Sequence, residues 1–88
     1  MRELGLTAAQ YFVLEQLRTD EPATMSRIIQ DAGVPQQTGS TALEVLTRIG
    51  AVESFESENH LGLALRTLTA HGAELRTRGR VLAAEGKD

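Results

Sequence analysis

Five uncharged polar side chains gather within six residues of the sequence: Gln36, Gln37, Thr38, Ser40 and Thr41. A glutamine amide can form two hydrogen bonds with adenine, and serine and threonine hydroxyls can reach bases or phosphates. The cluster therefore has the chemistry of a base-contacting surface. Small polar residues are also typical of solvated helix N-termini, so a helix start without any ligand is the alternative.

Two arginines flank this cluster, Arg27 before it and Arg48 after it. Guanidinium groups bind phosphate oxygens and thereby position a protein on a duplex. The charge around them is unfavourable, because residues 20–62 carry two arginines against seven acidic residues, a net charge of −5. Duplex DNA binding normally requires several neutralised phosphates. The run Arg76–Arg80 in the basic end of the chain is a further candidate source of phosphate contacts.

Catalytic and metal chemistry find no support in the sequence. It shows no nucleophile–base pairing, no glycine-rich phosphate loop and no metal-ligand spacing, and its two histidines, His60 and His71, lie eleven residues apart. There is no cysteine, which excludes disulfides and thiolate sites and fits a cytoplasmic protein. The start "MRELGLTAAQ" lacks a signal peptide, and no apolar run approaches the ~18 residues of a membrane span. We expect no enzyme activity, no cofactor, no metal and no membrane contact.

Capping signals divide the first 50 residues into three helices. Thr7 followed by Gln10 predicts a capping box at the start of the first helix. Thr24 is placed to cap a second helix, Gly33 is a left-handed stop, and Pro35 begins a third helix. In that third helix Ala42, Leu43, Leu46 and Ile49 recur at the spacing of a buried face. The pattern predicts a helix-turn-helix over about 24–50.

The periodicity changes after residue 50. Short alternating runs predict a two-stranded β-wing over about 51–68, and Thr69 caps a C-terminal helix over about 70–84. Gly79 interrupts this last helix and predicts a kink or fraying there. The predicted fold class is α+β, mainly α: one winged helix-turn-helix domain over 1–88, with three helices, a two-stranded wing and a C-terminal helix.

Three segments together resemble the MarR-type winged helix-turn-helix transcription regulators. They are "LTAAQYFVLEQL", "GVPQQTGSTALEVLTRIGAVE" and "LTAHGAEL", and the resemblance runs without gaps from Leu6 to Leu75. It implies a DNA-binding transcription regulator, with the third helix in the major groove of double-stranded DNA. The family's usual long dimerisation helices are missing or minimal here. A domain this small has little core, and Leu75, Val81 and Leu82 lie on a last helix that needs cover, so we expect a homodimer through the C-terminal helix.

The chain departs from the family pattern at the positions that usually contact DNA. Gln36 and Thr41 occupy places where the family usually has lysine or arginine. In the wing, the run "NHLG" has His60 at the usual aspartate and Leu61 at the usual arginine. Asn59 and His60 remain the candidate wing contacts to DNA. Gly39 replaces a branched apolar residue, so either two helices approach closely there or a packing residue has been lost.

Leucine at a wing tip suggests a different partner. Phe55, Leu61 and Leu63 can form an apolar patch of the kind that marks a protein-binding surface. The alternative function is therefore a winged helix repurposed for protein–protein interaction, which binds or inhibits another regulator or mimics acidic DNA.

Overall fold

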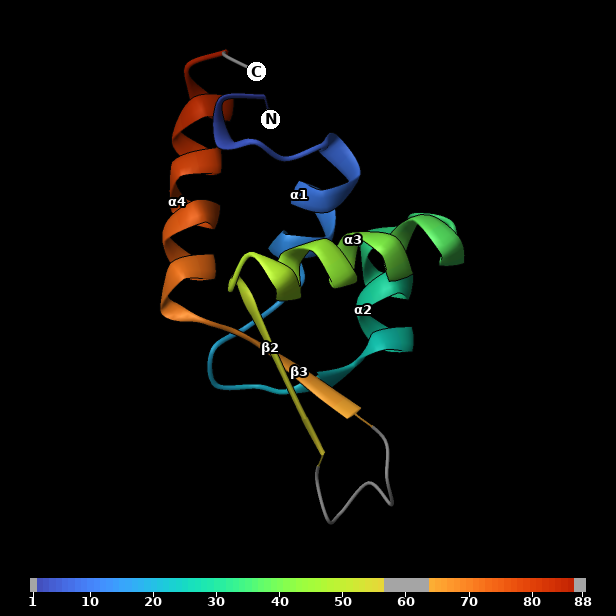
Figure 1. The fold of residues 1–88 in the computed structure, drawn as a ribbon. Coiled ribbons are helices and arrows are strands. Elements are labelled where there is room, and N and C mark those ends of the chain that lie inside the picture. The colour runs from blue at the N-terminus through green and yellow to red at the C-terminus, as the bar shows by residue number, and fades with distance from the viewer. Residues whose placement is uncertain (1, 57–63, 87–88) are drawn as a thin grey trace.

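The computed structural model describes residues 2–56 and 64–86, and its α-helices begin where the capping signals predict (Figure 1). The elements follow the order η1 (Arg2–Leu4), α1 (Ala8–Glu15), β1 (Ala23–Thr24), α2 (Met25–Ala32), α3 (Gln36–Arg48), β2 (Val52–Glu56), β3 (Ala64–Leu68) and α4 (Ala70–Ala84). The predicted winged helix, mainly α, is confirmed.

Three threonines start three of the helices. The Thr7 hydroxyl accepts a hydrogen bond from the Gln10 amide at 3.1 Å, and the Gln10 side chain accepts one from the Thr7 amide at 3.0 Å, which is the predicted capping box. The hydroxyls of Thr24 and Thr69 accept from the third residue beyond them, at 3.3 and 3.0 Å. These bonds satisfy amides that the first turn of a helix leaves unpaired.

Two glycines make the turns around α3. Gly33 ends α2 with φ of 70°, and Gly50 follows α3 with φ of 82°. Both values lie in the left-handed region that side chains with a Cβ rarely adopt. Pro35 sits directly before α3, so α2 and α3 are joined by only three residues. This tight connection is the predicted turn of the helix-turn-helix.

The sheet contains one more strand than the sequence predicted. It is antiparallel in the order β1-β3-β2, and β1 pairs Ala23 with Arg66 and Thr24 with Leu65. In the wing pair, Val52 lies opposite Leu68 and Phe55 opposite Leu65. A two-residue strand has no periodicity to detect, and Thr24 also carries the cap of α2, so the pattern showed only its helical role.

The core lies where α1, α2 and α3 meet the base of the sheet. Its largest fully buried side chains are Val13, Leu14, Leu17, Ile28, Leu43 and Leu46. One prediction for α3 is wrong: Ile49 is 42% exposed, because the helix ends at Arg48 and the chain turns away at Gly50.

The backbone of α4 packs closely against the rest of the chain at two glycines. A Cβ added at Gly72 would collide with the carbonyl oxygen of Ala51, and one added at Gly79 would collide with the ring of Tyr11. The predicted kink or fraying at Gly79 does not occur, and α4 continues as an α-helix to Ala84. Packing against α1 therefore outweighs the ~1 kcal/mol by which glycine disfavours a helix interior.

Candidate nucleic-acid interface

One face of α3 points away from the core. The buried residues of α3 are Gly39, Ala42, Leu43 and Leu46. At 3.6 residues per turn, the opposite side carries Gln37, Thr41, Glu44 and Arg48, and all four are exposed. We call these four residues the outward face of α3. In Figure 1, α3 crosses the front of the molecule, and its C-terminal end meets the start of β2.

The predicted polar cluster is divided by this geometry. Gln37 and Thr41 lie at the centre of the outward face, where the Gln37 amide nitrogen donates to the Thr41 hydroxyl at 3.5 Å. Gln36 and Ser40 lie on one flank of the helix, Gln36 exposed and Ser40 half-buried. Thr38 lies on the other flank, and it lines, together with Gln37 and Thr41, a shallow groove that α3 shares with the start of α1. Two of the five residues are thus best placed to meet a ligand.

Pro35 leaves the start of α3 open. Among the described residues no side chain forms a capping hydrogen bond at this helix. The amides of the first turn consequently face outward as donors, and such N-terminal amides attract anions. This feature strengthens the outward face as an anion-contacting surface, although α3 carries no basic residue before Arg48.

The two predicted phosphate-contacting arginines are each paired within their own helix. Arg27 lies 3.0 Å from Asp31, and Arg48 lies 3.2 Å from Glu44. Both arginine side chains are about 70% exposed. Exposed pairs of this kind contribute only about 0.2–1 kcal/mol, so either arginine can exchange its carboxylate for a phosphate at small cost.

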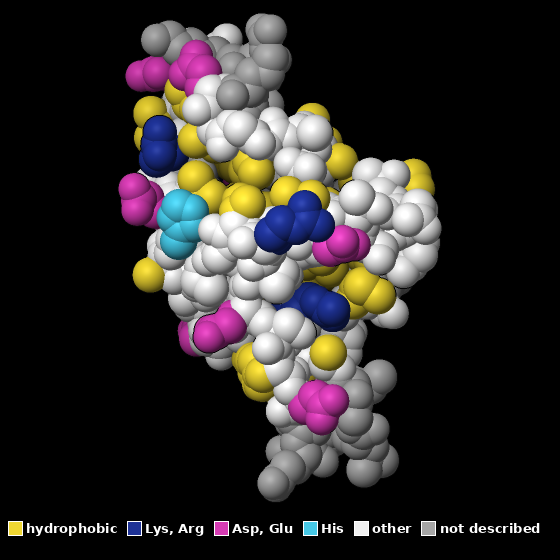
Figure 2. All heavy atoms as spheres, viewed as in Figure 1, with side chains coloured by type: hydrophobic (Ala, Val, Ile, Leu, Met, Phe, Trp, Pro, Cys, Tyr) yellow, Lys and Arg dark blue, Asp and Glu magenta, His cyan; other side chains and the backbone are white. Residues whose placement is uncertain are grey.

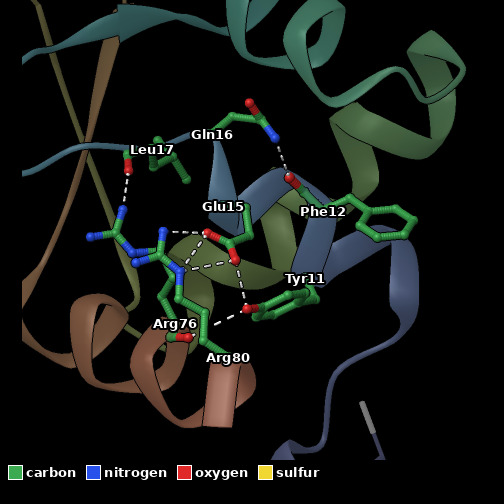
Figure 3. Close-up of polar contacts among 7 residues, drawn as sticks. All are labelled: Tyr11, Phe12, Glu15, Gln16, Leu17, Arg76 and Arg80. Carbon is green, nitrogen blue, oxygen red and sulfur yellow. Dashed lines mark hydrogen bonds and ion pairs between the residues drawn. The ribbon is translucent and has the colours of Figure 1, made fainter. Parts of the chain in front are cut away.

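Most of the basic run in α4 is used inside the molecule (Figure 3). The Arg76 guanidinium donates to the backbone carbonyl of Leu17 at 2.7 Å, and Arg80 donates to the Glu15 carboxylate at 2.7 Å. The Tyr11 hydroxyl donates to the same carboxylate at 2.7 Å. These contacts form a polar clamp of Tyr11, Glu15, Arg76 and Arg80 that fastens α4 to α1. The clamp removes Arg76 and Arg80 from the predicted supply of phosphate contacts.

The clamp also shifts two pKa values. Burial raises the pKa of Tyr11 to about 12, and its hydrogen bond to Glu15 adds to the rise. For Glu15, burial acts to raise the pKa, but the hydrogen bonds from Arg80 and Tyr11 together with the arginine charges outweigh burial, so its pKa is lowered. The neutral phenol and the ionised carboxylate are the forms that the folded chain favours.

Most of the residues predicted to act at the wing are not among those that the structure describes. Asn59, His60, Leu61 and Leu63 lie outside the described residues. Phe55, the remaining member of the predicted apolar patch, is 42% exposed on β2.

Two further residues matter to the surface and were not singled out from the sequence. Glu44 brings a negative charge to the outward face of α3, and its four-residue spacing to Arg48 was the available signal. Phe12 on α1 is 53% exposed, and the helical period that gathers Tyr11, Val13 and Leu14 on one side leaves Phe12 on the other. The structure also explains Gly39: a Cβ there would lie 2.6 Å from the side chain of Ile29. The two helices of the motif approach closely at this glycine.

Charge is sparse on the face that displays α3. In Figure 2 the Lys and Arg side chains on this face are few and separate from one another, and uncharged atoms cover most of it. The space-filling view therefore agrees with the acidic balance of the sequence. No group of three or more His, Cys, Asp or Glu that could hold a metal ion occurs within residues 2–56 and 64–86. Within the same ranges, no helix is both long and apolar enough to cross a membrane.

Solved structures with the same fold are MarR-family regulators. One from Silicibacter pomeroyi superposes with a TM-score of 0.77 at 27% identity, over 89% of this chain and 52% of that one. Reduced MarR from E. coli gives 0.81 at 26% identity, over 94% and 61%. A DNA complex of MepR from S. aureus gives 0.81 at 19% identity, over 96% and 69%. No protein-family model and no curated protein matches the sequence.

The superpositions cover nearly all of this chain but only part of its neighbours. The chain spans 52% and 61% of the S. pomeroyi and E. coli regulators. The resemblance predicted from the sequence is confirmed by the structure: the chain has a winged helix fold similar to that of MarR-family regulators.

Proposed function

We propose that this chain is a DNA-binding transcription regulator that places α3 in the major groove of double-stranded DNA. The observation that carries the proposal is the outward face of α3, where Gln37 and Thr41 present exposed hydrogen-bonding groups on the side of the helix opposite the core. The neighbours in fold are transcription regulators, and one was solved in complex with DNA. A major groove admits one α-helix, and the first turns of that helix reach the base edges.

In this proposal the chain contacts only a few phosphates of the DNA backbone. Arg27, Arg48 and the open amides at the start of α3 supply the contacts, with Asn59 and His60 as the wing candidates. Arg76 and Arg80 remain in the clamp. We therefore expect about two to five neutralised phosphates per subunit, which is a shallow salt dependence for a duplex-binding protein.

A homodimer through α4 completes the proposal. The inner side of α4 is occupied by the Gly72 and Gly79 contacts and by the clamp, whereas Val81 on its outer side is 51% exposed. A second copy packed on this outer side would bury the valine and pair two α3 helices. In a symmetric dimer the two helices meet half-sites about one helical turn of DNA apart.

A protein-binding function is the second candidate. Phe55 is 42% exposed on β2, and its neighbours Glu53 and Glu56 are exposed carboxylates. An aromatic residue among acidic ones suits a protein partner better than a phosphate backbone. In this alternative the fold is kept and the groove-binding surface serves a protein such as another regulator.

A salt titration separates the two. Fluorescence anisotropy of a labelled duplex pool is measured against the chain at increasing potassium chloride concentrations. The DNA-binding proposal expects binding at low salt and a logarithmic slope that corresponds to about two to five phosphates per subunit. Absence of binding at the lowest salt would contradict it and leave the protein-binding candidate. A single-stranded pool of the same composition serves as the control.

A further inference from the structure

We infer that α3 recognises an A·T base pair through Gln37, and that Thr41 acts as the positioning residue for its amide. This inference rests on the proposed function and adds the class of DNA sequence that the outward face selects. It is argued from one side-chain pair and from the residue types around that pair.

The position of Gln37 favours direct contact with a base. Gln37 lies in the first turn of α3, at the centre of the outward face and opposite the buried Gly39 and Leu43. The side chain is exposed and lines, with Thr41, the open groove between α3 and the start of α1, so a ligand laid against this face can reach it. Gln36 lies on the flank of the same turn, so the two adjacent glutamines have different access to a ligand.

Thr41 contacts the Gln37 amide. The hydrogen bond between Gln37 Nε2 and Thr41 Oγ1 spans one helical turn and, at 3.5 Å, is long and weak. It uses one of the two amide N–H groups and none of the lone pairs of Oε1. One N–H and Oε1 are left to a ligand as one donor and one acceptor. The contact favours one orientation of the amide and so lowers the side-chain entropy lost on contact with DNA.

One donor beside one acceptor matches adenine and not guanine. In the major groove adenine presents N7 as an acceptor and N6–H as a donor, whereas guanine presents two acceptors, N7 and O6. The Gln37 amide can therefore pair fully with adenine, but against guanine its Oε1 would face O6 without a proton between them. Arginine, which supplies two donors to guanine, is absent from α3 until Arg48. Arg48 lies at the other end of the helix and is paired with Glu44.

The experiment begins with selection of preferred duplexes from a randomised pool by the unmodified chain. Affinity is then measured by anisotropy for the selected duplex and for copies with single base pairs exchanged. At one A·T pair per half-site, exchange to G·C should weaken binding about 5- to 100-fold. In Gln37→Ala this preference should fall below about twofold, and in Gln37→Arg the preferred pair should change to G·C.

Two matched variants test the geometry. Gln36→Ala removes the adjacent glutamine and should leave the preference intact. Thr41→Val keeps the size of the side chain but removes the hydroxyl, so it should reduce the preference for the A·T pair severalfold. Circular dichroism confirms the fold of each variant, and exposed positions such as these tolerate substitution.

The possible outcomes distinguish failure of the A·T inference from failure of the proposed DNA-binding function. Duplex binding with a preference that Gln37→Ala and Gln37→Arg leave unchanged overturns the inference and leaves the proposed function standing. Selection of G·C at the pair that Gln37→Ala affects overturns the inference as well. Failure of the unmodified chain to bind any duplex at low salt removes the proposed function, and the inference with it.

Discussion

At the scale of single residues, Glu44 is the group on the outward face of α3 that most opposes a phosphate backbone. Its carboxylate lies 3.2 Å from Arg48 and so both repels phosphates and occupies the guanidinium. The pair is exposed and weak, which means that it tunes affinity without supporting the fold. A single substitution at Glu44 would therefore change the net charge of α3 without affecting the fold.

We predict that Glu44→Gln strengthens duplex binding. The change removes a negative charge and releases Arg48, so affinity should rise about two- to fivefold at low salt, the range expected for an exposed charge pair. The measurement is anisotropy with the duplex pool. Glu74→Gln on α4 removes an equal charge from an exposed site away from α3, and it should change affinity by less than about half as much. An equal effect of both variants would show that only total charge matters.

Titration of Tyr11 can be followed by ultraviolet absorbance without interference, because the chain has one tyrosine and no tryptophan. The titration therefore measures the polar clamp directly. Its pKa is raised to about 12 by burial and then by the hydrogen bond to Glu15. We predict that phenolate absorbance rises only near that pH in the folded chain and near pH ~10 in the urea-unfolded chain. The stability that this shift supplies is complete below the unfolded pKa and is lost as pH rises toward the folded value.

Glu15→Gln supplies the matched variant for this titration. The substitution removes the charge and leaves the neutral phenol an amide oxygen to bind, so the pKa of Tyr11 should move down toward 10. The lowered pKa of Glu15 also contributes stability, but with the opposite dependence on pH. Its contribution is present above the unfolded pKa and is lost as pH falls through the folded value. Urea unfolding of the variant should consequently lose less stability on acidification than the unmodified chain.

At the scale of elements, glycine positions decide how the helices are spaced. Gly39 brings α2 and α3 together at Ile29, and Gly72 brings α4 onto the backbone of Ala51. The second contact is the stricter one, since a backbone carbonyl cannot move aside as a side chain can. Ala51 also accepts the backbone hydrogen bond of Thr69 at 3.1 Å, which ties the carbonyl to the start of α4.

We predict that Gly72→Ala destabilises the chain. Helix propensity alone would favour alanine by up to ~1 kcal/mol. Overpacking against a fixed carbonyl costs about 1–3 kcal/mol, so the net effect should be a loss of stability. Chemical denaturation monitored by circular dichroism measures it. Thr77→Ala, an exposed substitution in the same helix, should be neutral or slightly stabilising, and a Gly72→Ala variant as stable as that control would contradict the close approach.

At the scale of the whole molecule, α4 links the winged helix to its proposed second copy. Its inner side is committed to α1, to Ala51 and to the clamp, so only its outer side is available for association. A chain of 88 residues buries a small core, and an obligate partner would add to its stability. Because α4 is packed tightly against α1 and Ala51, a dimer formed through α4 would also fix how the two α3 helices lie relative to one another.

We predict that the chain is a dimer at concentrations on the order of 50 µM, where weak self-association is populated by mass action. Light scattering should give a mass of twice 9.5 kDa. Val81→Glu places a charge on the exposed outer side of α4 and should yield a monomer with unchanged circular dichroism. Glu53→Gln, an exposed change on β2 and not on α4, is the control. A monomeric mass for the unmodified chain would remove the paired half-site model.

Local chemistry by itself determined where the helices begin and end. The hydroxyls of Thr7, Thr24 and Thr69 act on amides three residues away, and Gly33 turns the chain within one residue. Such interactions are complete within one helical turn, which is why the capping pattern predicted them. The order of these elements then predicted the winged helix, because alternating and helical periods follow one another in that fold.

Only the tertiary structure decided how the basic and glycine residues of α4 are used. Arg76 and Arg80 meet Leu17 and Glu15 across 59 and 65 residues of sequence, and no local pattern predicts such partners. The same holds for β1, whose two residues become a strand only because β3 lies beside them. Gly79, predicted to kink a helix, instead makes room for the ring of Tyr11. In each case the deciding contact joins segments that are distant in sequence, so packing rather than propensity determines the outcome.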